Sequence, residues 1–369
     1  MKDRDEGRNS GLTNRQKLGH LMQLAEYREE VLRKKPRLHS LFLEMTAKCN
    51  EHCMHCGSNC GDFAEVDALS KEELCEFLDR VKAGFPMREL MLCVTGGEPL
   101  LRKDFFEIMD YANRLGFTWG MTSNGTLISR EVAHRLAECG MRTISISVDG
   151  LRETHEWFRQ SPGSYDKTMR GIRNLLEEGA FSHVQITTVV HQRNFQELEA
   201  MYREFSQIGV RSWRVIGIEP IGRAKSQANL LLSAQQQKEL MDFIVAHRFA
   251  GPMEVCYGCS HFLGLSYERE VRPWYFLCNA GVYTASVTYN GDITACLDIE
   301  RHPDVIQGNI RRDDFKEVWN NRFRIFRNDY KKAGRCAECE DYVYCAGGAC
   351  HTWDYDGMDQ QMCMRDLLG

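Results

Sequence analysis

The chain has 369 residues, of which 43% are hydrophobic and 27% are charged, so it can form one large globular domain and a smaller one. Its net charge is -5 and its Lys and Arg residues are dispersed, which argues against a nucleic acid or a membrane surface as partner. The first residues have no apolar core like that of a signal peptide, and no run of about 18 apolar residues occurs. We therefore expect a cytoplasmic location and no membrane partner.

The predicted elements begin with a helix over 13–35, which Thr13 caps and Pro36 follows. In the next part of the chain, strand-like runs alternate with helical patterns. Strands are predicted at 40–45, 89–95, 118–122, 143–148, 183–190 and 212–218. Helices are predicted between them at 70–83, 102–115, 129–139, 164–178 and 194–208. Ser70 and Glu73 form a capping box at the start of the first of these helices.

The alternation of six strands with helices predicts a parallel sheet, either doubly wound or curled into a partial barrel. No G-x-G-x-x-G follows any of these strands, which argues against a dinucleotide-binding fold. We therefore predict an α/β chain with a partial (β/α)6 TIM-like barrel. Its functional loops would lie at the C-terminal ends of the strands.

The pattern changes after the sixth predicted strand. A helix is predicted over 233–248, and an aromatic stretch without clear periodicity follows it up to about residue 277. Beyond this bridge come a hairpin with Asn290-Gly291 at its turn, a short helix near 313–321 and a Gly-rich tail dense in cysteine. We divide the chain into an N-terminal helical extension (1–37), the barrel (38–230), the bridge (231–277) and a small cysteine-rich C-terminal domain (278–369).

Cysteine is the residue type that carries most of the chemistry. Sixteen are present, and in a cytoplasmic chain clustered thiols are better explained as metal ligands than as disulfides. The stretch CNEHCMHCGSNCG follows the first strand and contains C-x3-C-x2-C at Cys49, Cys53 and Cys56. A 4Fe-4S cluster held by three thiolates keeps one iron open for a cofactor. A structural zinc ion would instead need a fourth ligand, such as Cys60 or His55.

This loop resembles that of radical S-adenosylmethionine (SAM) enzymes. The resemblance implies that Cys49, Cys53 and Cys56 are catalytic, because their 4Fe-4S cluster would pass one electron into SAM and release a 5′-deoxyadenosyl radical that abstracts a hydrogen. Many members carry an aromatic residue just before the third cysteine, packed against the adenine. His55 stands there in this chain, and it can stack and also donate a hydrogen bond. The resemblance covers about residues 38–225.

Residues at the ends of the predicted strands extend the resemblance. The second strand ends in GGEP (96–99), where glycines let backbone approach a ligand closely, and the matching family segment contacts the amino group of SAM. Each of these residues, taken alone, could also be an ordinary turn former or one member of a surface ion pair. Together they resemble the family's contacts to the ribose and carboxylate of SAM, with Ser147 and Arg159 as the main pair. The predicted SAM-binding residues are His55, Gly96, Gly97, Glu98, Pro99, Ser123, Asn124, Ser147, Asp149 and Arg159.

The C-terminal domain contains C-x12-G-x4-C, then C-x2-C-x5-C-x4-C, and finally one more cysteine. These spacings resemble the SPASM extension, which binds auxiliary iron-sulfur clusters in radical SAM enzymes that modify peptides and proteins. The usual interval before Cys350 is three residues, and this chain has four. A zinc ribbon built from the C-x2-C pairs at Cys256 and Cys336 is the alternative, and it would leave five cysteines unexplained.

The resemblance implies two auxiliary clusters of the 4Fe-4S type. The nearer cluster would be held by Cys278, Cys296 and Cys350, with Cys259 or Cys256 completing it. The outer cluster would be held by Cys336, Cys339, Cys345 and Cys363. The remaining cysteines in regular elements, Cys75, Cys93 and Cys139, are expected to be buried packing residues.

The combined resemblance predicts a radical SAM oxidoreductase that acts on a peptide or protein. The expected substrate is a ribosomally synthesised precursor peptide, and the expected product carries a C-C, thioether or ether cross-link. An anaerobic sulfatase-maturing enzyme is the alternative. Many of these carry an Asp directly after the second hairpin cysteine as a base, whereas this chain has Leu297 there and Asp298 one later, expected on the other strand face. A non-catalytic iron-sulfur electron carrier is a distant alternative, because it would need neither the GGEP turn nor an open iron.

Two protein partners follow from these expectations. Many peptide maturases have a leader-binding winged-helix module, and the residues before the first predicted strand are too few for one. We therefore expect either a separate leader-binding protein or direct binding of the peptide by the barrel. An electron donor of the flavodoxin or ferredoxin type would reduce the first cluster.

Overall fold

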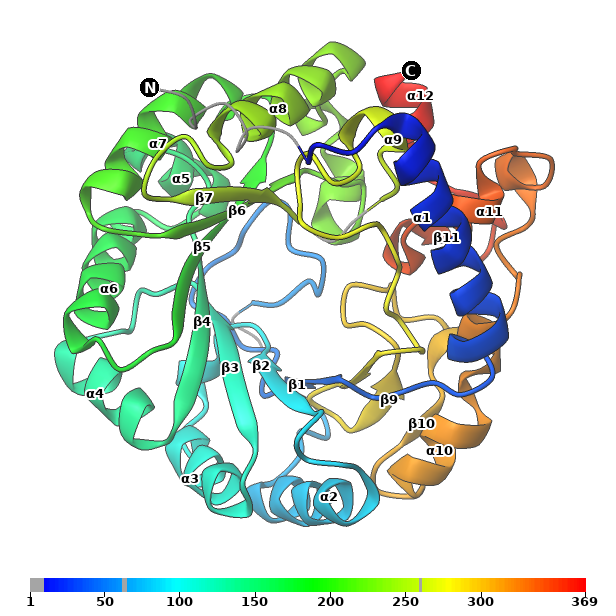
Figure 1. Cartoon of the computed structure of the whole chain (residues 1–369). Coiled ribbons are helices and arrows are strands. Elements are labelled where there is room, and N and C mark those ends of the chain that lie inside the picture. The colour runs from blue at the N-terminus through cyan, green and yellow to red at the C-terminus, as the bar shows by residue number, and fades with distance from the viewer. Residues whose placement is uncertain (1–9, 62–64, 259–260) are drawn as a thin grey trace.

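The computed structural model describes residues 10–61, 65–258 and 261–369, and Figure 1 shows a ring of strands surrounded by helices. One sheet runs in the order β10-β9-β8-β1-β2-β3-β4-β5-β6-β7. Neighbouring strands from β8 through β1 to β7 pair in parallel, whereas the β8–β9 and β9–β10 pairs are antiparallel. The predicted barrel strands are β1 (Ser40–Glu44), β2 (Met91–Thr95), β3 (Thr118–Ser123), β4 (Met141–Ser147), β5 (His183–Val190) and β6 (Ser212–Gly217). The prediction of a partial TIM-like barrel is confirmed.

The outer side of the ring is covered by helices because the outward side chains of the strands are apolar. Leu41, Leu43, Leu92 and Val94 are buried in one continuous core with helix residues such as Phe77. The helices between strands are α2 (Lys71–Gly84), α3 (Phe105–Leu115), α4 (Arg130–Glu138), α5 (Arg152–Arg159), α6 (Ser164–Glu178) and α7 (Leu198–Gln207). Of these, α5 was not predicted. In the described ranges, no helix combines the length and the apolar character that crossing a bilayer requires.

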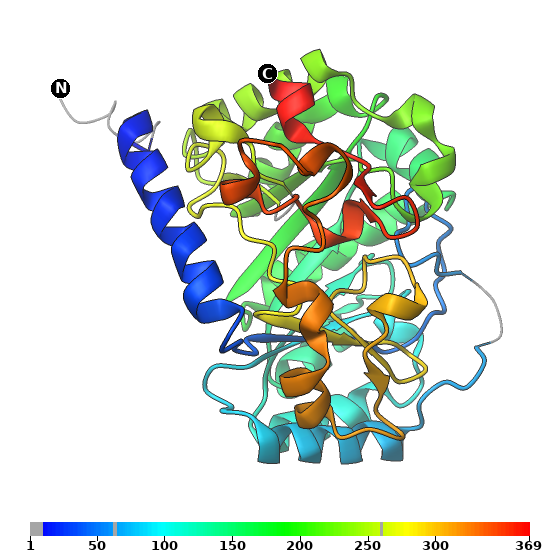
Figure 2. The same cartoon turned by 90° about the vertical axis from the view of Figure 1, so that its right-hand side faces the viewer.

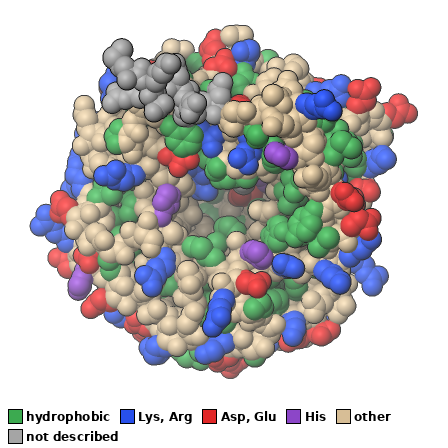
Figure 3. All heavy atoms as spheres, in the orientation of Figure 1, with side chains coloured by type: hydrophobic (Ala, Val, Ile, Leu, Met, Phe, Trp, Pro, Cys, Tyr) green, Lys and Arg blue, Asp and Glu red, His purple; other side chains and the backbone are tan. Residues whose placement is uncertain are grey.

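The inner side of the ring is polar. Ser145 and Thr187 lie with their hydroxyl oxygens 2.6 Å apart, and Arg214 donates from Nε to the Thr187 hydroxyl at 3.1 Å. These three side chains come from β4, β5 and β6, at positions that alternate with the buried outward ones. The space-filling view in Figure 3 shows a hollow at the centre of the ring.

The sheet extends beyond the six predicted strands at both edges. β7 (Glu254–Tyr257) lies in the predicted bridge, between α8 (Ala234–His247) and α9 (Gly264–Tyr267), and pairs in parallel with β6. β8 (Thr284–Val287) belongs to the predicted C-terminal hairpin and pairs in parallel with β1. The sheet therefore continues across both predicted domain boundaries. Both strands have only four residues, too few for their alternation to identify them in the sequence.

The C-terminal part consists of short elements that lie together on one side of the barrel (Figure 2). The predicted hairpin is formed by β8 and β9, and Gly291 at its turn has a φ of 92°. The elements after β8 are β9 (Asp292–Thr294), β10 (Gly308–Asn309), α10 (Phe315–Asn321), α11 (Tyr342–Cys345), β11 (Trp353–Asp354), β12 (Asp359–Gln360) and α12 (Met364–Leu368).

The N-terminal helix α1 (Asn14–Tyr27) lies along the C-terminal part, as Figures 1 and 2 both show. Lys17 pairs with Glu270 of the bridge at 2.6 Å. Arg28, in the π-helical turn that continues α1, donates to the carbonyl of Val343 at 3.0 Å. The helix therefore connects the bridge to the C-terminal part.

Candidate functional site

A cavity opens at the carboxyl ends of the strands, and the loops after β1, β2, β3, β4 and β6 contribute to its wall. The predicted site residues that line it are Cys49, Cys53, His55, Cys56, Gly96, Gly97, Ser123, Asn124, Ser147 and Arg159. Glu98, Pro99 and Asp149 are buried behind this wall. The carboxyl ends of β1, β2, β3 and β4 thus meet at one site, as strand ends do in a parallel barrel.

The loop with the first three cysteines is held by the end of α5. The amide of His52 donates to the carbonyl of Arg159 at 3.1 Å, and the amide of Met54 donates to the carbonyl of Phe158 at 2.9 Å. Carbonyls in the last turn of a helix have no partner inside the helix. The loop therefore satisfies the end of α5, and α5 fixes the middle of the loop.

The three thiols of this loop differ in their environments. Burial raises the pKa of Cys49 to about 11 and also raises the pKa of Cys53. A hydrogen bond with Cys60 lowers the pKa of Cys56 to about 6. Coordination to a metal deprotonates a thiol outright. Three thiols from one loop that face one cavity are a donor set that suits an iron-sulfur cluster, so the residues fit the predicted cofactor.

Gly96 and Gly97 bring the end of β2 against the same loop. A Cβ atom on Gly96 would lie 2.4 Å from the carbonyl oxygen of Thr46, and one on Gly97 would lie 2.1 Å from that of Lys48. Only glycine allows so close an approach. The amide of Gly97 donates to the Thr46 carbonyl at 2.7 Å. The two glycines therefore admit the neighbouring backbone, and they also line the cavity, where they were predicted to admit a ligand.

The carboxylate of Glu98 is turned away from the cavity. The Ser123 hydroxyl lies 3.0 Å from each of its oxygens, and the amide of Asn124 donates to Oε2 at 2.9 Å. Burial raises the pKa of Glu98 to about 7. In this structure Glu98 joins the loops after β2 and β3, and its contact with the amino group of SAM stays a prediction.

Arg159 lies buried between two carboxylates. Its Nη1 donates to Glu51 Oε2 at 2.8 Å, and its Nε and Nη2 donate to Asp149 Oδ2 at 3.0 and 2.7 Å. Although burial opposes the charge, Asp149 raises the pKa of Arg159 well above its ordinary value. These bonds use three of the five N–H groups of a guanidinium. A ligand carboxylate could therefore bind Arg159, as predicted, without breaking either ion pair.

His55 presents a flat, neutral ring at the cavity wall. Burial lowers its pKa to about 4, so the ring is uncharged near pH 7. It stacks on Phe158, with ring centroids 4.4 Å apart and planes 3° apart. Its Nδ1 is buried and has no hydrogen-bond partner among the described residues. An unpaired buried nitrogen in such a wall indicates a ligand, which suits the predicted adenine contact.

The four thiols predicted for the outer auxiliary cluster lie around one pocket in the C-terminal part. They are Cys336, Cys339, Cys345 and Cys363. Burial raises the pKa of Cys336 to about 11 and that of Cys345 to about 12. Arg365 donates from Nη1 to the sulfur of Cys339 at 3.3 Å. The structure thus places all four thiols around one pocket, and their role as cluster ligands stays a prediction.

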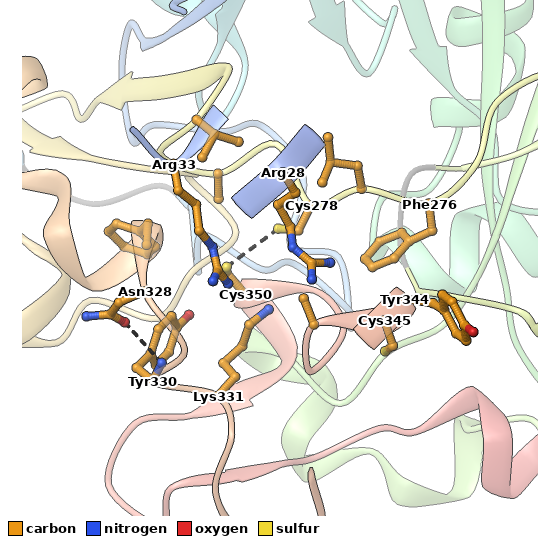
Figure 4. Close-up of a pocket in the computed structure, with 15 residues that line it drawn as sticks. Arg28, Arg33, Phe276, Cys278, Asn328, Tyr330, Lys331, Tyr344, Cys345 and Cys350 are labelled. Carbon is orange, nitrogen blue, oxygen red and sulfur yellow. Dashed lines mark hydrogen bonds between the residues drawn. The ribbon is translucent and has the colours of Figure 1, made fainter. Parts of the chain in front are cut away.

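Two thiols predicted for the nearer cluster, Cys278 and Cys350, face each other with their sulfurs 3.5 Å apart (Figure 4). Their mutual hydrogen bond lowers the pKa of Cys278 well below its ordinary value. Lys331, Arg28 and Arg33 line the same pocket, and three cations favour a thiolate-rich site. Cys345 lines both this pocket and the outer one, so it lies between the two predicted clusters.

Cys296 approaches the nearer site from the hairpin side. Its sulfur lies 4.0 Å from Oδ2 of Asp298, a residue that lines the cavity at the strand ends. The Tyr355 hydroxyl donates to the carbonyl of Cys350 at 3.2 Å. The grouping of Cys296 with Cys278 and Cys350 in one cluster stays a prediction. Cys256 lies in β7, where its thiol contacts the Tyr257 carbonyl at 3.4 Å. Cys259, the other predicted fourth ligand, lies outside the described residues.

Glu219 was missed in the sequence, although it follows the end of β6. Its Oε1 lies 3.1 Å from His261 Nε2, and its Oε2 lies 2.7 Å from His351 Nε2. Although burial opposes the charge, His351 lowers the pKa of Glu219. Glu219 thus connects the barrel to the bridge and to the C-terminal part at the cavity wall. The signal that selected Ser123 and Ser147, a polar residue at a strand end, would also have selected Glu219.

Asp298 occupies a different position from the expected one. It was expected on the far face of a strand, but β9 ends at Thr294, so strand alternation no longer applies at Asp298. Its carboxylate lines the cavity, and a Cβ on Gly57 of the three-thiol loop would lie 3.5 Å from its Oδ1. The expectation that Asp298 points away from the site is therefore wrong, although Leu297 still stands directly after Cys296.

Comparison with protein families gives two matches. The model of the radical SAM superfamily matches residues 43–205, and that of the SPASM iron-sulfur cluster-binding domain matches residues 278–340. Together they cover the three-thiol loop, the strand-end segments and most of the C-terminal thiols.

Individual relatives cover most of the chain. An AdoMet-dependent heme synthase of Nitratidesulfovibrio vulgaris is 28% identical over 332 residues, which are 85% of this chain and 88% of the relative. The mycofactocin maturase MftC of Mycobacterium tuberculosis is 30% identical over 322 residues, covering 85% and 79%. Among solved structures, SAM-bound anSMEcpe has a TM-score of 0.71 at 19% identity, covering 89% of this chain and 94% of that one. SAM-bound SuiB of Streptococcus suis has a TM-score of 0.67 at 16% identity, covering 85% and 73%. These two structures support the fold.

Proposed function

Because the chain belongs to the radical SAM superfamily and ends in a SPASM iron-sulfur domain, we propose that it modifies a ribosomally synthesised precursor peptide. Hydrogen abstraction from the peptide would lead to a C-C, thioether or ether cross-link. SAM and the three-thiol cluster supply the abstraction chemistry when bound, and two auxiliary clusters would lie in the C-terminal part. The mycofactocin maturase among the relatives acts in the maturation of mycofactocin, and SuiB was solved with a precursor peptide.

The observation that carries this proposal is an outer cavity that shares part of its wall with the cavity beside the three thiols. The cavity at the strand ends shares Gly57, Arg223, Asp298 and His351 with a second cavity that opens between the barrel and the hairpin. Trp353 and Tyr289 belong to the wall of this outer cavity. A substrate that enters here would lie between the three-thiol loop and Asp298, whose Oδ2 is 4.0 Å from the sulfur of Cys296.

The charges at the outer opening favour a peptide over a polyanion. Lys225 pairs with Glu300, and Arg301 pairs with Glu44 at 2.8 Å. Arg223 donates to the backbone carbonyl of Cys53 at 2.7 Å and to that of Cys60. These cations therefore already have partners in the protein. A site for a substrate with several carboxylates would be expected to contain unpaired cations.

A tetrapyrrole is the second candidate substrate, because several relatives are heme synthases and one is an Fe-coproporphyrin III synthase. Surface ion pairs contribute little stability and exchange partners readily. The cations at the outer opening could therefore leave their present partners and bind the propionates of a tetrapyrrole. A sulfatase-type substrate is the third, since Asp298 faces the cavity.

Two partners complete the proposal. A flavodoxin- or ferredoxin-type protein would reduce the three-thiol cluster. A separate leader-binding protein would present the precursor peptide, unless the barrel binds the peptide directly.

The proposal is tested with the reconstituted enzyme, SAM and dithionite under anaerobic conditions. We expect 5′-deoxyadenosine to form, and its rate to rise when a short peptide encoded beside this gene is added. Fe-coproporphyrin III, tested in parallel, should leave the rate unchanged. Stimulation by the tetrapyrrole alone would overturn the peptide assignment, and absence of 5′-deoxyadenosine in every arm would indicate an electron carrier.

A further inference from the structure

A buried lysine of the C-terminal part has no acidic partner. Lys331 is 6% exposed, and its ammonium donates to the carbonyl of Gly348. In the ranges that the structure describes, no carboxylate lies within ion-pairing distance of its Nζ. The ring centroid of Tyr330 lies 5.9 Å from this nitrogen, at the outer limit of a cation–π contact. An ammonium that is removed from water is costly unless an opposite charge lies beside it. Lys331 therefore indicates a negatively charged group in this part of the protein.

The other cations of the same pocket are compensated by the protein itself. Arg28, Arg33 and Lys331 all line the pocket predicted to hold the nearer cluster. Arg28 pairs with Glu29 at 2.8 Å. Arg33 pairs with Glu29 at 2.5 Å and with Asp329 at 2.9 Å. Two guanidinium groups thus share two carboxylates, whereas the charge of Lys331 is left over.

Thiols lie in front of the ammonium of Lys331. Cys278, Cys345 and Cys350 line the same pocket, and the sulfurs of Cys278 and Cys350 lie 3.5 Å apart. Figure 4 shows that the side chain of Lys331 extends toward these two sulfurs. The ligand of an iron-sulfur cluster is the thiolate, so a bound cluster would bring negative charge to this place. The uncompensated ammonium thus fits the predicted nearer cluster.

The same lysine also borders the outer site. Gly347 and Gly348 line the outer pocket together with Cys345. A Cβ atom on Gly347 would lie 2.6 Å from the Cβ of Lys331, so the lysine packs directly against this backbone. The hydrogen bond to the carbonyl of Gly348 holds its ammonium on the same segment. Lys331 therefore lies between the two predicted cluster sites, in the wall of the nearer pocket and behind the wall of the outer one.

From this geometry we propose that Lys331 is the shared counter-charge of both auxiliary clusters and raises their reduction potentials. Reduction makes a cluster more negative by one electron, and a fixed cation beside it stabilises the reduced form. Lys331 would supply no ligand to iron, and it would act only through its charge. The proposal deepens the proposed function and rests on it, because it requires both auxiliary clusters.

The test is a redox titration of the reconstituted full chain, followed by electron paramagnetic resonance. Lys331→Met removes the charge and keeps an unbranched side chain. One-electron reduction of both auxiliary clusters should become about tenfold less favourable, which is a fall of about 59 mV in each potential. The three-thiol cluster should keep its potential, and the variant without its three thiols identifies its signal. Unchanged potentials of the auxiliary clusters, or a fall in only one of them, would overturn the proposal.

Lys332→Met is the matched control, because it removes the same charge from the next residue of the chain. Lys332 is exposed, and water and salt screen an exposed charge. Its substitution should change the equilibrium constant for reduction of each cluster by less than about twofold. A fall as large as that in Lys331→Met would reflect the net charge of the protein and would overturn the proposal.

A second variant guards against loss of the clusters in Lys331→Met. Lys331→Arg keeps the charge, so both auxiliary clusters should keep potentials close to those of the wild type at unchanged iron content. Loss of auxiliary iron in Lys331→Met but not in Lys331→Arg would show that the clusters need the charge, and would support the proposal. Loss in both variants would assign Lys331 to packing and overturn it. Wild-type protein that binds no iron beyond the three-thiol cluster would instead refute the auxiliary clusters of the proposed function, and this proposal with them.

Discussion

The two thiol-rich regions of this molecule are held by different means. The three-thiol loop is hydrogen-bonded to the end of α5 and packed against Gly96 and Gly97, over a barrel with one continuous apolar core. The thiols of the C-terminal part lie among elements of two to five residues. Their local apolar cluster is built around Cys336, Tyr342 and Trp353.

This difference predicts where the fold depends on metal. A barrel with its own core can stay folded without a cluster, and its loop can keep the cavity in shape. A small segment with few apolar contacts lacks the buried area for independent stability, so metal binding would contribute directly to its folding. The first site would therefore be preformed, whereas the auxiliary sites would form with their clusters.

The largest expected effect comes from removing the three thiols of the preformed site. In a variant with Cys49, Cys53 and Cys56 all changed to Ala, SAM cleavage should be abolished and iron should fall by about one cluster per chain. The auxiliary clusters should remain, because their thiols lie in the other region. 5′-Deoxyadenosine and iron assays measure both effects, and full 5′-deoxyadenosine formation by this variant would refute the assignment of the first site.

The next effect separates SAM cleavage from product formation. Bond formation after hydrogen abstraction leaves one surplus electron, and a cluster beside the substrate is a suitable acceptor. Cys296→Ala should therefore stop the accumulation of modified peptide but leave uncoupled 5′-deoxyadenosine measurable by mass spectrometry. Cys75→Ala, in α2, is the control and should change neither. Undiminished product from a folded Cys296→Ala enzyme would make the C-terminal part purely structural.

Removal of iron tests the difference in folding. After chelation, the backbone amides of residues 334–369 should lose protection against hydrogen exchange, whereas those of β1 to β6 should keep most of theirs. Mass spectrometry of peptide fragments resolves the two regions in one experiment. Equal loss of protection in both regions would show that the barrel also depends on its cluster.

A smaller effect concerns the interior of the preformed site. Burial raises the pKa of Glu98 from 4.5 to about 7, so the folded state binds more protons than the unfolded state between these values. The stability of the chain should therefore fall as pH rises from 4.5 to 7, by at most about 3 kcal/mol from this group. Urea unfolding of the wild type and of Glu98→Gln should show this pH dependence in the wild type and a weaker one in the variant. If stability depended on pH in the same way in both proteins, the raised pKa would belong to a group other than Glu98.

Local signals in the sequence predicted much of the fold and of the thiol sites. Thr13 caps α1 and Ser70 forms the capping box that starts α2, as predicted from the sequence. The six barrel strands were visible as apolar runs between helices. The C-x2-C spacing of Cys336 and Cys339 placed these thiols around one pocket. In each case, residues close in sequence determine the structure.

The features that were missed depend on residues far apart in the chain. The hydrogen bonds of Glu98 to Ser123 and Asn124 could not be predicted, because these residues belong to another loop. The position of Lys331 becomes visible only once Cys278, far earlier in the chain, lies in the same pocket. A sequence pattern gives no sign of which of several nearby cations already has an acidic partner.

The central claim is that this cavity abstracts hydrogen from a peptide, and isotope transfer tests it most directly. The precursor peptide would be prepared with deuterium at its carbon positions and incubated with reconstituted enzyme, SAM and dithionite. We predict that 5′-deoxyadenosine gains deuterium, measured by mass spectrometry, in proportion to the modified peptide formed. 5′-Deoxyadenosine that stays unlabelled while the peptide is modified, or that gains deuterium only from a labelled tetrapyrrole, would contradict the account.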